Sequence, residues 1–136
     1  MVYLKPQYYS DQQTIIIPAC YRHEGKHSVT VRILWSCPRC GMPRGRIKPG
    51  ISLDGSQRLP VSDWNNPCGH EDVYWKMRKE AVKNGLNPSI FQCIYCNNIA
   101  THLIRGEKVC AQCLPDCIES DNDLARVGIL GIQGGA

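Results

Sequence analysis

Nine cysteines, six of which form three Cys-x-x-Cys pairs, are the residues of this 136-residue chain best suited to chemistry. The pairs are Cys37 with Cys40, Cys93 with Cys96, and Cys110 with Cys113. Two thiolates at this spacing can converge on one metal ion from a tight turn, as they do in zinc knuckles. The pairing therefore predicts metal sites rather than scattered core thiols.

The last two pairs together have the spacing of a complete zinc site. Residues 93–113, `CIYCNNIATHLIRGEKVCAQC`, follow the pattern Cys-x2-Cys-x13-Cys-x2-Cys. Four thiolates at about 2.3 Å close a tetrahedral shell around zinc and leave no position for water. We predict a structural zinc ion held by Cys93, Cys96, Cys110 and Cys113. Buried free thiols or disulfides are the alternatives, and disulfides are disfavoured because the sequence opens without a secretion signal.

The first pair needs two more ligands, and the nearest candidates downstream are Cys68 and His70 in `NNPCGHED`. Pro67 and Gly69 are typical of a tight turn, which would let both side chains face one ion. We predict a Cys3His zinc site made by Cys37, Cys40, Cys68 and His70. A helix is expected to begin directly after His70, where its dipole would favour negatively charged thiolates.

Two other interpretations of these residues compete with the zinc sites. Cys20, His23 and His27 also have ligand-like spacing, but they lack a fourth donor, so a strand cysteine with two loop histidines is the favoured interpretation. Pairing Cys68 with His70 as nucleophile and base would leave Cys37 and Cys40 without partners. No catalytic acid, base or nucleophile stands out, so we expect no enzymatic activity; an enzyme with an open metal position is the alternative hypothesis.

Three β-hairpins and one main helix are predicted to position the ligands. The hairpins are `TIIIPACYR` with `HSVTVRILWSC` around the turn `HEGK`, `RGRIKPGISL` with `SQRLPVSDW` around `DG`, and `THLIR` with `KVC` around `GE`. Pro49 and Pro60 indicate edge strands in the second hairpin. The helix is expected over about residues 71–84, and a short helix could follow Cys113.

These elements predict a small α+β protein stapled by metal, with two modules like zinc ribbons or treble clefs. The first module is expected to occupy residues 1–86, with a linker over 87–92 and the second module over 93–120. The tail, 121–136, has four glycines in its last nine residues and is expected to be flexible or docked on a partner.

The stretch `CIYC…VCAQCLPDC`, residues 93–117, resembles the four-cysteine zinc-binding domain at the start of the ClpX unfoldase, although its spacer is shorter. The resemblance implies a treble-clef-like zinc module, which in that family binds protein partners and self-associates. It also implies that Cys117 is a core thiol rather than a ligand. The whole chain resembles small uncharacterised bacterial and bacteriophage zinc proteins.

The charge distribution favours the first cysteine region for binding an anionic partner. The formal net charge is +4, but two zinc ions and seven ligand thiolates would reduce it to about +1. Residues 37–70 hold five basic and two acidic side chains, whereas residues 93–136 hold three and five. The basic residues, with Trp35 and Trp64 as a nearby aromatic platform, suggest nucleic-acid binding; they are Arg39, Arg44, Arg46, Lys48 and Arg58.

The functional expectation is a zinc-binding, nucleic-acid-associated accessory factor acting in transcription or on DNA or RNA. The alternative is a protein-interaction or assembly module, such as a bacteriophage virion component or an inhibitor of a host enzyme. The longest apolar runs are far shorter than the roughly 20 residues that cross a bilayer, so no membrane partner is expected. We expect a cytoplasmic protein, in the host cytoplasm or the virion if it is viral.

Overall fold

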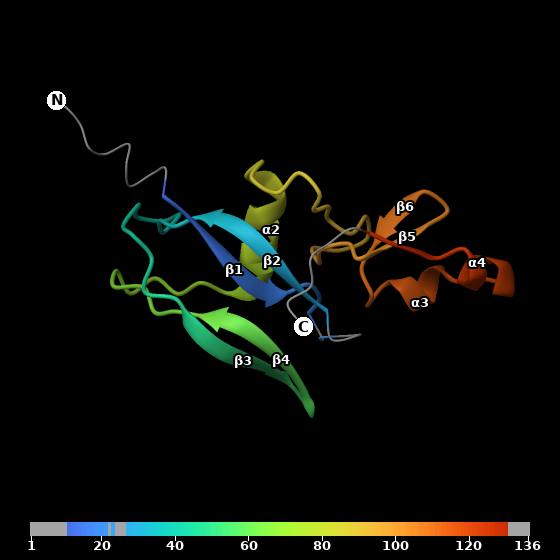
Figure 1. Ribbon diagram of the computed structural model, residues 1–136, viewed down its shortest axis with the longest axis horizontal. Helices are drawn as coiled ribbons and strands as arrows, with labels where there is room; N and C mark the ends of the chain where they lie inside the picture. Colours follow the sequence, from blue (N-terminus) through green and yellow to red (C-terminus); the bar gives the residue numbers. More distant parts are fainter. Residues whose placement is uncertain (1–10, 22, 24–26, 131–136) are drawn as a thin grey trace.

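The computed structural model describes residues 11–21, 23 and 27–130, which form a small α+β structure of β-hairpins and short helices (Figure 1). Residues 24–26 of the predicted `HEGK` turn and residues 131–136 of the predicted tail lie outside the described residues. In chain order the elements are β1 Gln12–Pro18, β2 Ser28–Leu34, β3 Lys48–Asp54, β4 Gln57–Asp63, α2 Tyr74–Lys83, β5 His102–Ile104, β6 Glu107–Val109, α3 Leu114–Cys117, α4 Asp121–Ala125 and β7 Gly128–Ile129.

The hairpin of β1 and β2 carries the apolar residues that begin the core. Its strands are antiparallel, with Ile15 opposite Val31. These side chains are buried together with Met77 and Ala81 from helix α2, which lies against this hairpin (Figure 1). β-Branched residues favour the strands because they pack well on a pleated surface. The hairpin and the helix therefore form a packed core, and the first cysteine pair follows the end of β2.

The predicted hairpin of residues 44–64 is also present, as β3 and β4. The chain turns at Gly55, whose φ of 61° lies in the region that glycine adopts without strain. Leu59 and Val61 on β4 are buried, whereas Ile51 and Leu53 on β3 are exposed. The hairpin thus packs on the rest of the protein with one face and leaves apolar side chains on the other.

The main helix begins later than the sequence predicts. α2 starts at Tyr74, with Val73 as an N-cap residue that makes no side-chain cap bond. Asp72 is kept out of the helix because its carboxylate accepts hydrogen bonds from Arg44 and Trp64. His70 therefore lies three residues before the helix cap, and the expectation that the ligands directly precede a helix N-terminus is wrong.

The second cysteine region contains the predicted short hairpin and helix, together with two elements that the sequence did not predict. β5 and β6 are joined through Arg105 and Gly106, whose φ values are 51° and 80°. α3 follows Cys113. The unexpected elements are α4 and β7, and β7 pairs with β5 to make a three-stranded sheet. The chain after α4 is therefore docked on the module as far as residue 130.

One hydrophobic cluster runs through both cysteine regions. It joins Ile15 and Val31 of the first hairpin to Ile99, Ile104 and Val109 of the second region. The backbone also connects them, because the Ile99 N–H donates to the Ala19 carbonyl at 2.9 Å. The two regions consequently share a core.

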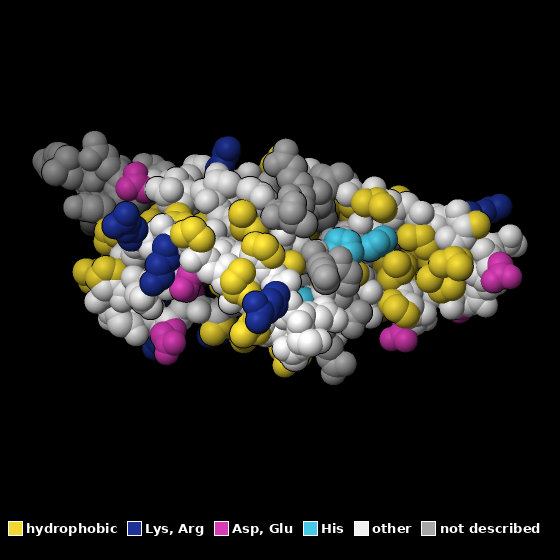
Figure 2. All heavy atoms as spheres, turned by 60° about the horizontal axis from the view of Figure 1, so that its bottom comes forward, with side chains coloured by type: hydrophobic (Ala, Val, Ile, Leu, Met, Phe, Trp, Pro, Cys, Tyr) yellow, Lys and Arg dark blue, Asp and Glu magenta, His cyan; other side chains and the backbone are white. Residues whose placement is uncertain are grey.

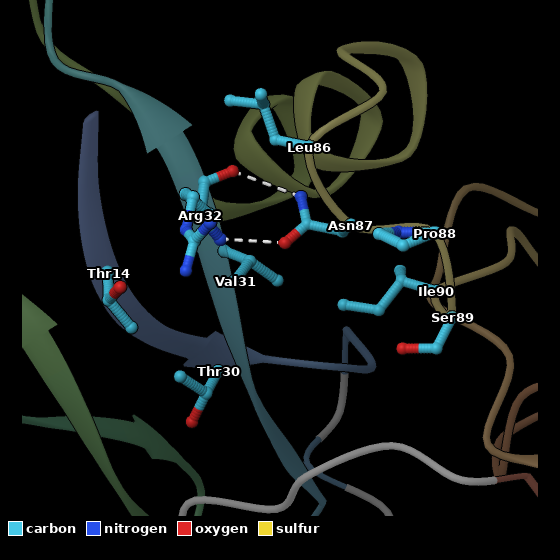
Figure 3. Close-up of a pocket in the computed structure, with 9 residues that line it drawn as sticks. All are labelled: Thr14, Thr30, Val31, Arg32, Leu86, Asn87, Pro88, Ser89 and Ile90. Atoms are coloured by element: carbon cyan, nitrogen blue, oxygen red, sulfur yellow. Dashed lines mark hydrogen bonds between the residues drawn. The ribbon is translucent and has the colours of Figure 1, made fainter. Parts of the chain in front are cut away.

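The segment between the two regions is held against β2 by one asparagine side chain. The Asn87 amide accepts from the Arg32 N–H at 2.8 Å and donates to the Arg32 carbonyl at 3.0 Å, as a neighbouring strand would (Figure 3). A recess of about 400 Å³ lies beside this contact.

None of the helices in the described part of the chain has the length and the apolar composition that crossing a membrane requires.

Candidate metal centres

The eight predicted metal ligands gather into two groups that could each hold a metal ion. Within each group, every pair of donor atoms lies within 4.8 Å. The first group is Cys37, Cys40, Cys68 and His70, and the second is Cys93, Cys96, Cys110 and Cys113. We call them cluster 1 and cluster 2.

The first half of cluster 1 is a knuckle that directly follows β2. The Cys37 carbonyl accepts from the Gly41 N–H at 2.8 Å, and the Cys37 N–H donates to the Met42 carbonyl at 2.7 Å. Gly41 has a φ of 79°, which a residue with a side chain rarely adopts. Glycine after the second cysteine therefore closes the turn that brings the sulfurs of Cys37 and Cys40 together.

The second half of cluster 1 is a turn organised by Asn66. The Asn66 carbonyl accepts from the Gly69 N–H at 3.0 Å, and its side-chain amide donates to the His70 carbonyl at 2.8 Å. The amide oxygen of Asn66 also accepts from the Gly45 N–H at 3.2 Å, in the segment after the knuckle. Asn66 thus shapes one half of cluster 1 and binds it to the other.

A buried ion pair fastens the two halves of cluster 1. The Arg44 side chain is completely buried and donates two hydrogen bonds of 3.1 Å to the Asp72 carboxylate. Arg44 follows the knuckle by four residues and Asp72 follows His70 by two. Arg44 also pairs with Glu80 of α2 at 3.1 Å. The bidentate geometry fixes orientation as well as charge, so this pair holds both half-sites to the helix.

The spacing of donor atoms in cluster 1 fits a tetrahedral zinc ion. His70 Nδ1 lies 3.5 Å from Cys37 Sγ, and tetrahedral bonds of about 2.3 Å to sulfur and about 2.05 Å to nitrogen would place them about 3.6 Å apart. Burial opposes ionisation of Cys37, but hydrogen bonds from the backbone of Arg39 and Cys40 outweigh it and lower the thiol pKa to about 6. These hydrogen bonds favour the thiolate form of Cys37, which is the form that binds metal.

Cluster 2 has the spacing of four sulfurs around one ion. Cys96 Sγ lies 3.6 Å from Cys110 Sγ and 3.7 Å from Cys113 Sγ. Two sulfurs bound tetrahedrally to zinc at about 2.3 Å would lie about 3.8 Å apart. Backbone N–H groups also point at the sulfurs, with Asn98 donating to Cys96 at 3.4 Å and Cys113 donating to Cys110 at 3.3 Å. These contacts stabilise negative charge on the sulfurs.

The neighbours of Cys110 in cluster 2 favour its thiolate form. A hydrogen bond from the Cys20 thiol, opposed by burial and assisted by the Asn98 amide and by Cys113, lowers the pKa of Cys110 to about 4. The same hydrogen bond, together with burial, raises the pKa of Cys20. Cys20 is therefore a protonated thiol that donates to a thiolate ligand of cluster 2.

No family model, curated protein or solved structure matches this chain. The resemblance of residues 93–117 to the ClpX zinc-binding domain therefore stays a prediction, as does the assignment of either module to the ribbon or treble-clef class. The two groups that could each hold a metal ion rest on their own geometry and on no relative.

Four of the five basic residues predicted to bind nucleic acid are exposed, and the fifth, Arg44, is buried. Arg39, Arg46, Lys48 and Arg58 are exposed. Arg44 is buried and paired with Asp72 and Glu80, so its guanidinium does not face solvent. The expectation that Arg44 is available to a phosphate is wrong, because the chain uses this charge inside cluster 1.

The proposed tryptophan platform is also wrong. Trp35 is only 8% exposed, and its ring packs edge to face on Trp64 with centroids 5.0 Å apart. The Trp35 indole N–H donates to the Gly45 carbonyl, and the Trp64 indole N–H donates to Asp72. Trp35 therefore supports cluster 1 from within the core, and the half-buried Trp64 packs against it.

The remaining cysteines and histidines form no third group of metal donors among the described residues. Cys20 lies beside Cys110 rather than with its sequence neighbours, and His23 Nε2 lies 2.9 Å from Ser52 Oγ. The ring of His27 instead packs edge to face on His102. Cys117 is buried and donates to the Cys113 carbonyl at 3.4 Å, as a core thiol would.

Sequence reasoning missed the residues that surround the ligands. Asp72 and Asn66 were within reach, since both flank the predicted ligands of cluster 1. No sequence pattern indicated that Cys20 would interact with Cys110 or that Arg78 would be buried near cluster 2, because both residues are distant from that cluster in the sequence.

Proposed function

We propose that this chain is a non-enzymatic protein with two structural zinc ions, which binds nucleic acid through the basic surface beside cluster 1. Four thiolates in one cluster and three thiolates with one imidazole in the other are ligand sets that zinc prefers. Each set fills a tetrahedral shell with protein atoms. Neither ion would then offer a position to a substrate, which supports a structural role.

The observation that carries the nucleic-acid proposal is the placement of Arg46 and Lys48. Both line one recess of about 390 Å³ together with Ile47, Pro49 and Asn65. Both side chains are exposed, and residues two apart in extended backbone point the same way. Within the part of the chain that the structure describes, neither side chain is in an ion pair, although Asp63 lies opposite Lys48 in the hairpin register. Two adjacent cations of this kind suit consecutive phosphates.

The surroundings of this recess also support binding of an anion. Arg39 on the knuckle and Arg58 on β4 are exposed in the same module. Figure 2 shows Lys and Arg side chains mainly over the half of the molecule that carries the β1–β2 and β3–β4 hairpins, interspersed with apolar and with acidic side chains. The second module has an excess of acidic residues. The surface for nucleic acid is therefore restricted to the first module.

A gel-shift series over increasing salt tests the proposal with single-stranded and duplex oligonucleotides. Each phosphate contact adds about 0.7 to the salt slope for a single strand and about 0.9 for a duplex. The double variant Arg46→Gln/Lys48→Gln should weaken binding and lower the slope by about 1.4 to 1.8. The control Lys83→Gln/Arg126→Gln removes the same charge elsewhere and should leave the slope unchanged. Absence of binding by the zinc-loaded wild type at low salt would refute nucleic-acid binding.

A second candidate function, a protein-interaction or assembly module, is favoured by the exposed face of β3. Ile51 is 57% exposed and Leu53 is 65% exposed, and their cross-strand neighbours are Pro60 and Arg58. Such a face suits a protein partner, including a virion component or a host enzyme. Native mass spectrometry should then detect self-association or a complex that Ile51→Ser/Leu53→Ser abolishes without changing the zinc count.

A further inference from the structure

Arg78 of helix α2 is a buried cation without a carboxylate partner among the described residues. It is 3% exposed, and one Nη donates to the Pro18 carbonyl at 3.2 Å. Its Nε is buried and has no hydrogen-bond partner. The contrast with Arg44 is direct, because Arg44 is equally buried but has Asp72 and Glu80 as counter-ions. A guanidinium stays protonated in proteins, so an unpaired buried arginine is costly.

The negative groups that face Arg78 are sulfurs of the second cysteine region. Burial lowers the pKa of Arg78, whereas negative charge on Cys96 and Cys110, two of the cluster 2 residues, raises it. Cys20, whose thiol donates a hydrogen bond to Cys110, lines one recess together with Arg78 and Pro18. The side chain therefore reaches from the main helix to the segment of residues 18–21, which itself contacts the second module.

We propose that Arg78 is the counter-charge of the ion bound in cluster 2, so that metal binding there joins the two modules into one cooperative unit. This inference rests on the proposed occupancy of cluster 2 by zinc. Zinc with four thiolates carries a net charge of −2, which a single adjacent guanidinium partly neutralises. Arg78 is a positioning residue in this role, since it touches no metal.

Other contacts at the same place also bring the first module to cluster 2. The Tyr21 N–H donates to the side-chain oxygen of Asn98 at 3.1 Å, and the Asn98 amide donates to Cys110 Sγ at 3.4 Å. The Cys20 thiol donates to the same sulfur. The outer shell of the Cys110 ligand thus comes in large part from the segment that follows β1. Such outer-shell groups orient ligands and set metal affinity.

The test is site-resolved metal affinity of the full chain carrying Arg78→Met, which keeps the length of the side chain and removes its charge. Cobalt(II) loading separates the two clusters, because four-sulfur and three-sulfur-one-nitrogen sites absorb differently. In competition with a chelator, Arg78→Met should lower the affinity of cluster 2 by about tenfold to a hundredfold and leave cluster 1 unchanged. Arg78→Lys should restore most of the loss, and Lys83→Met on the same helix should have no effect.

The possible outcomes separate this inference from the proposed function. A wild type that binds no ion in cluster 2 refutes both. A wild type with two ions, in which Arg78→Met binds as tightly as wild type at cluster 2, refutes the inference alone. Equal weakening of both clusters, without rescue by Arg78→Lys, also refutes it, because general destabilisation would then explain the effect.

A second variant decides the matter if Arg78→Met does not fold. Cys113→Ser removes one ligand of cluster 2 and leaves the first module intact in sequence. The proposal predicts faster amide hydrogen exchange in helix α2 of this variant, because Arg78 loses its counter-charge. Wild-type protection of α2 in Cys113→Ser, with its cluster 2 empty, would overturn the proposal.

Discussion

Replacing Asp72 by asparagine should damage the first module more than any other neutral substitution of similar size. The carboxylate accepts two hydrogen bonds from Arg44, and single bonds from Trp64 and Asn66. The Asp72 side chain is only 11% exposed, and that of Arg44 is 0% exposed. Asparagine is neutral and has one oxygen in place of two, so the variant leaves a buried guanidinium with a weaker set of acceptors.

The loss of stability in Asp72→Asn depends on which partners Arg44 keeps. Removing one partner of a buried ion pair costs about 3 to 5 kcal/mol. Glu80 still pairs with Arg44 at 3.1 Å, so we expect the lower end, about 3 kcal/mol. With a urea m-value of about 1.5 kcal/mol/M, the unfolding midpoint of zinc-loaded protein should fall by about 2 M. Because Asp72 also binds Asn66, cluster 1 should lose zinc about tenfold to a hundredfold more readily, while cluster 2 keeps its ion.

Urea unfolding and native mass spectrometry in a chelator series measure these two effects. Asp63→Asn is the matched control, because Asp63 is exposed on β4 and its neutralisation should change stability by less than about 0.5 kcal/mol. The double variant Arg44→Met/Asp72→Asn should be less damaged than the sum of the single variants, since it leaves no buried charge unpaired. An unchanged midpoint and a full zinc count in Asp72→Asn would refute the role given to the ion pair.

Four further variants test the two clusters and the backbone around them. Gly45→Ala should abolish ordered cluster 1, because an added Cβ would lie 1.7 Å from the Asn65 carbonyl oxygen; Gly55→Ala meets no atom within 4 Å and should cost only about 1 to 2 kcal/mol for its backbone conformation. His70→Ala should reduce the zinc count from two to one, and retention of both ions would show that another ligand replaces His70. Cys117→Ala should keep both ions and lower the free energy of unfolding by about 1 kcal/mol, since this thiol is in the core; loss of zinc would contradict its placement.

The parts of the structure that could be predicted are those in which the deciding residues are close in sequence. Cys-x-x-Cys spacing, the `DG` turn and the β-branched residues of 14–17 each act through neighbours, and the corresponding knuckles and hairpins are present. The start of α2 could not be predicted in the same way. Glu71 and Asp72 resemble the acidic first turn of a helix, but Arg44, nearly thirty residues earlier, pairs with Asp72 outside the helix.

The same reason explains the failed interpretation of Arg44 and the two tryptophans. Basic and aromatic residues near a knuckle have the composition of a nucleic-acid surface, and composition does not distinguish a surface from a core. Burial of Trp35 and the ion pairs of Arg44 depend on contacts between residues 34–45, 64–72 and α2. Cys20 was likewise weighed as a ligand with His23 and His27, whereas its contact is Cys110, ninety residues away.

The two buried arginines differ in where their counter-charge comes from, and this difference decides what each module should lose when metal is removed. Arg44 is neutralised by carboxylates that the first module itself supplies, so its burial requires no metal. Arg78 faces sulfurs, whose negative charge becomes permanent only when an ion holds them as thiolates. Removal of metal from cluster 2 should therefore weaken the packing of α2 in the first module. Removal of metal from cluster 1 should have a smaller effect on the second module, because the Arg44 pair remains complete. The direction of this coupling follows from which arginine has its own counter-ion.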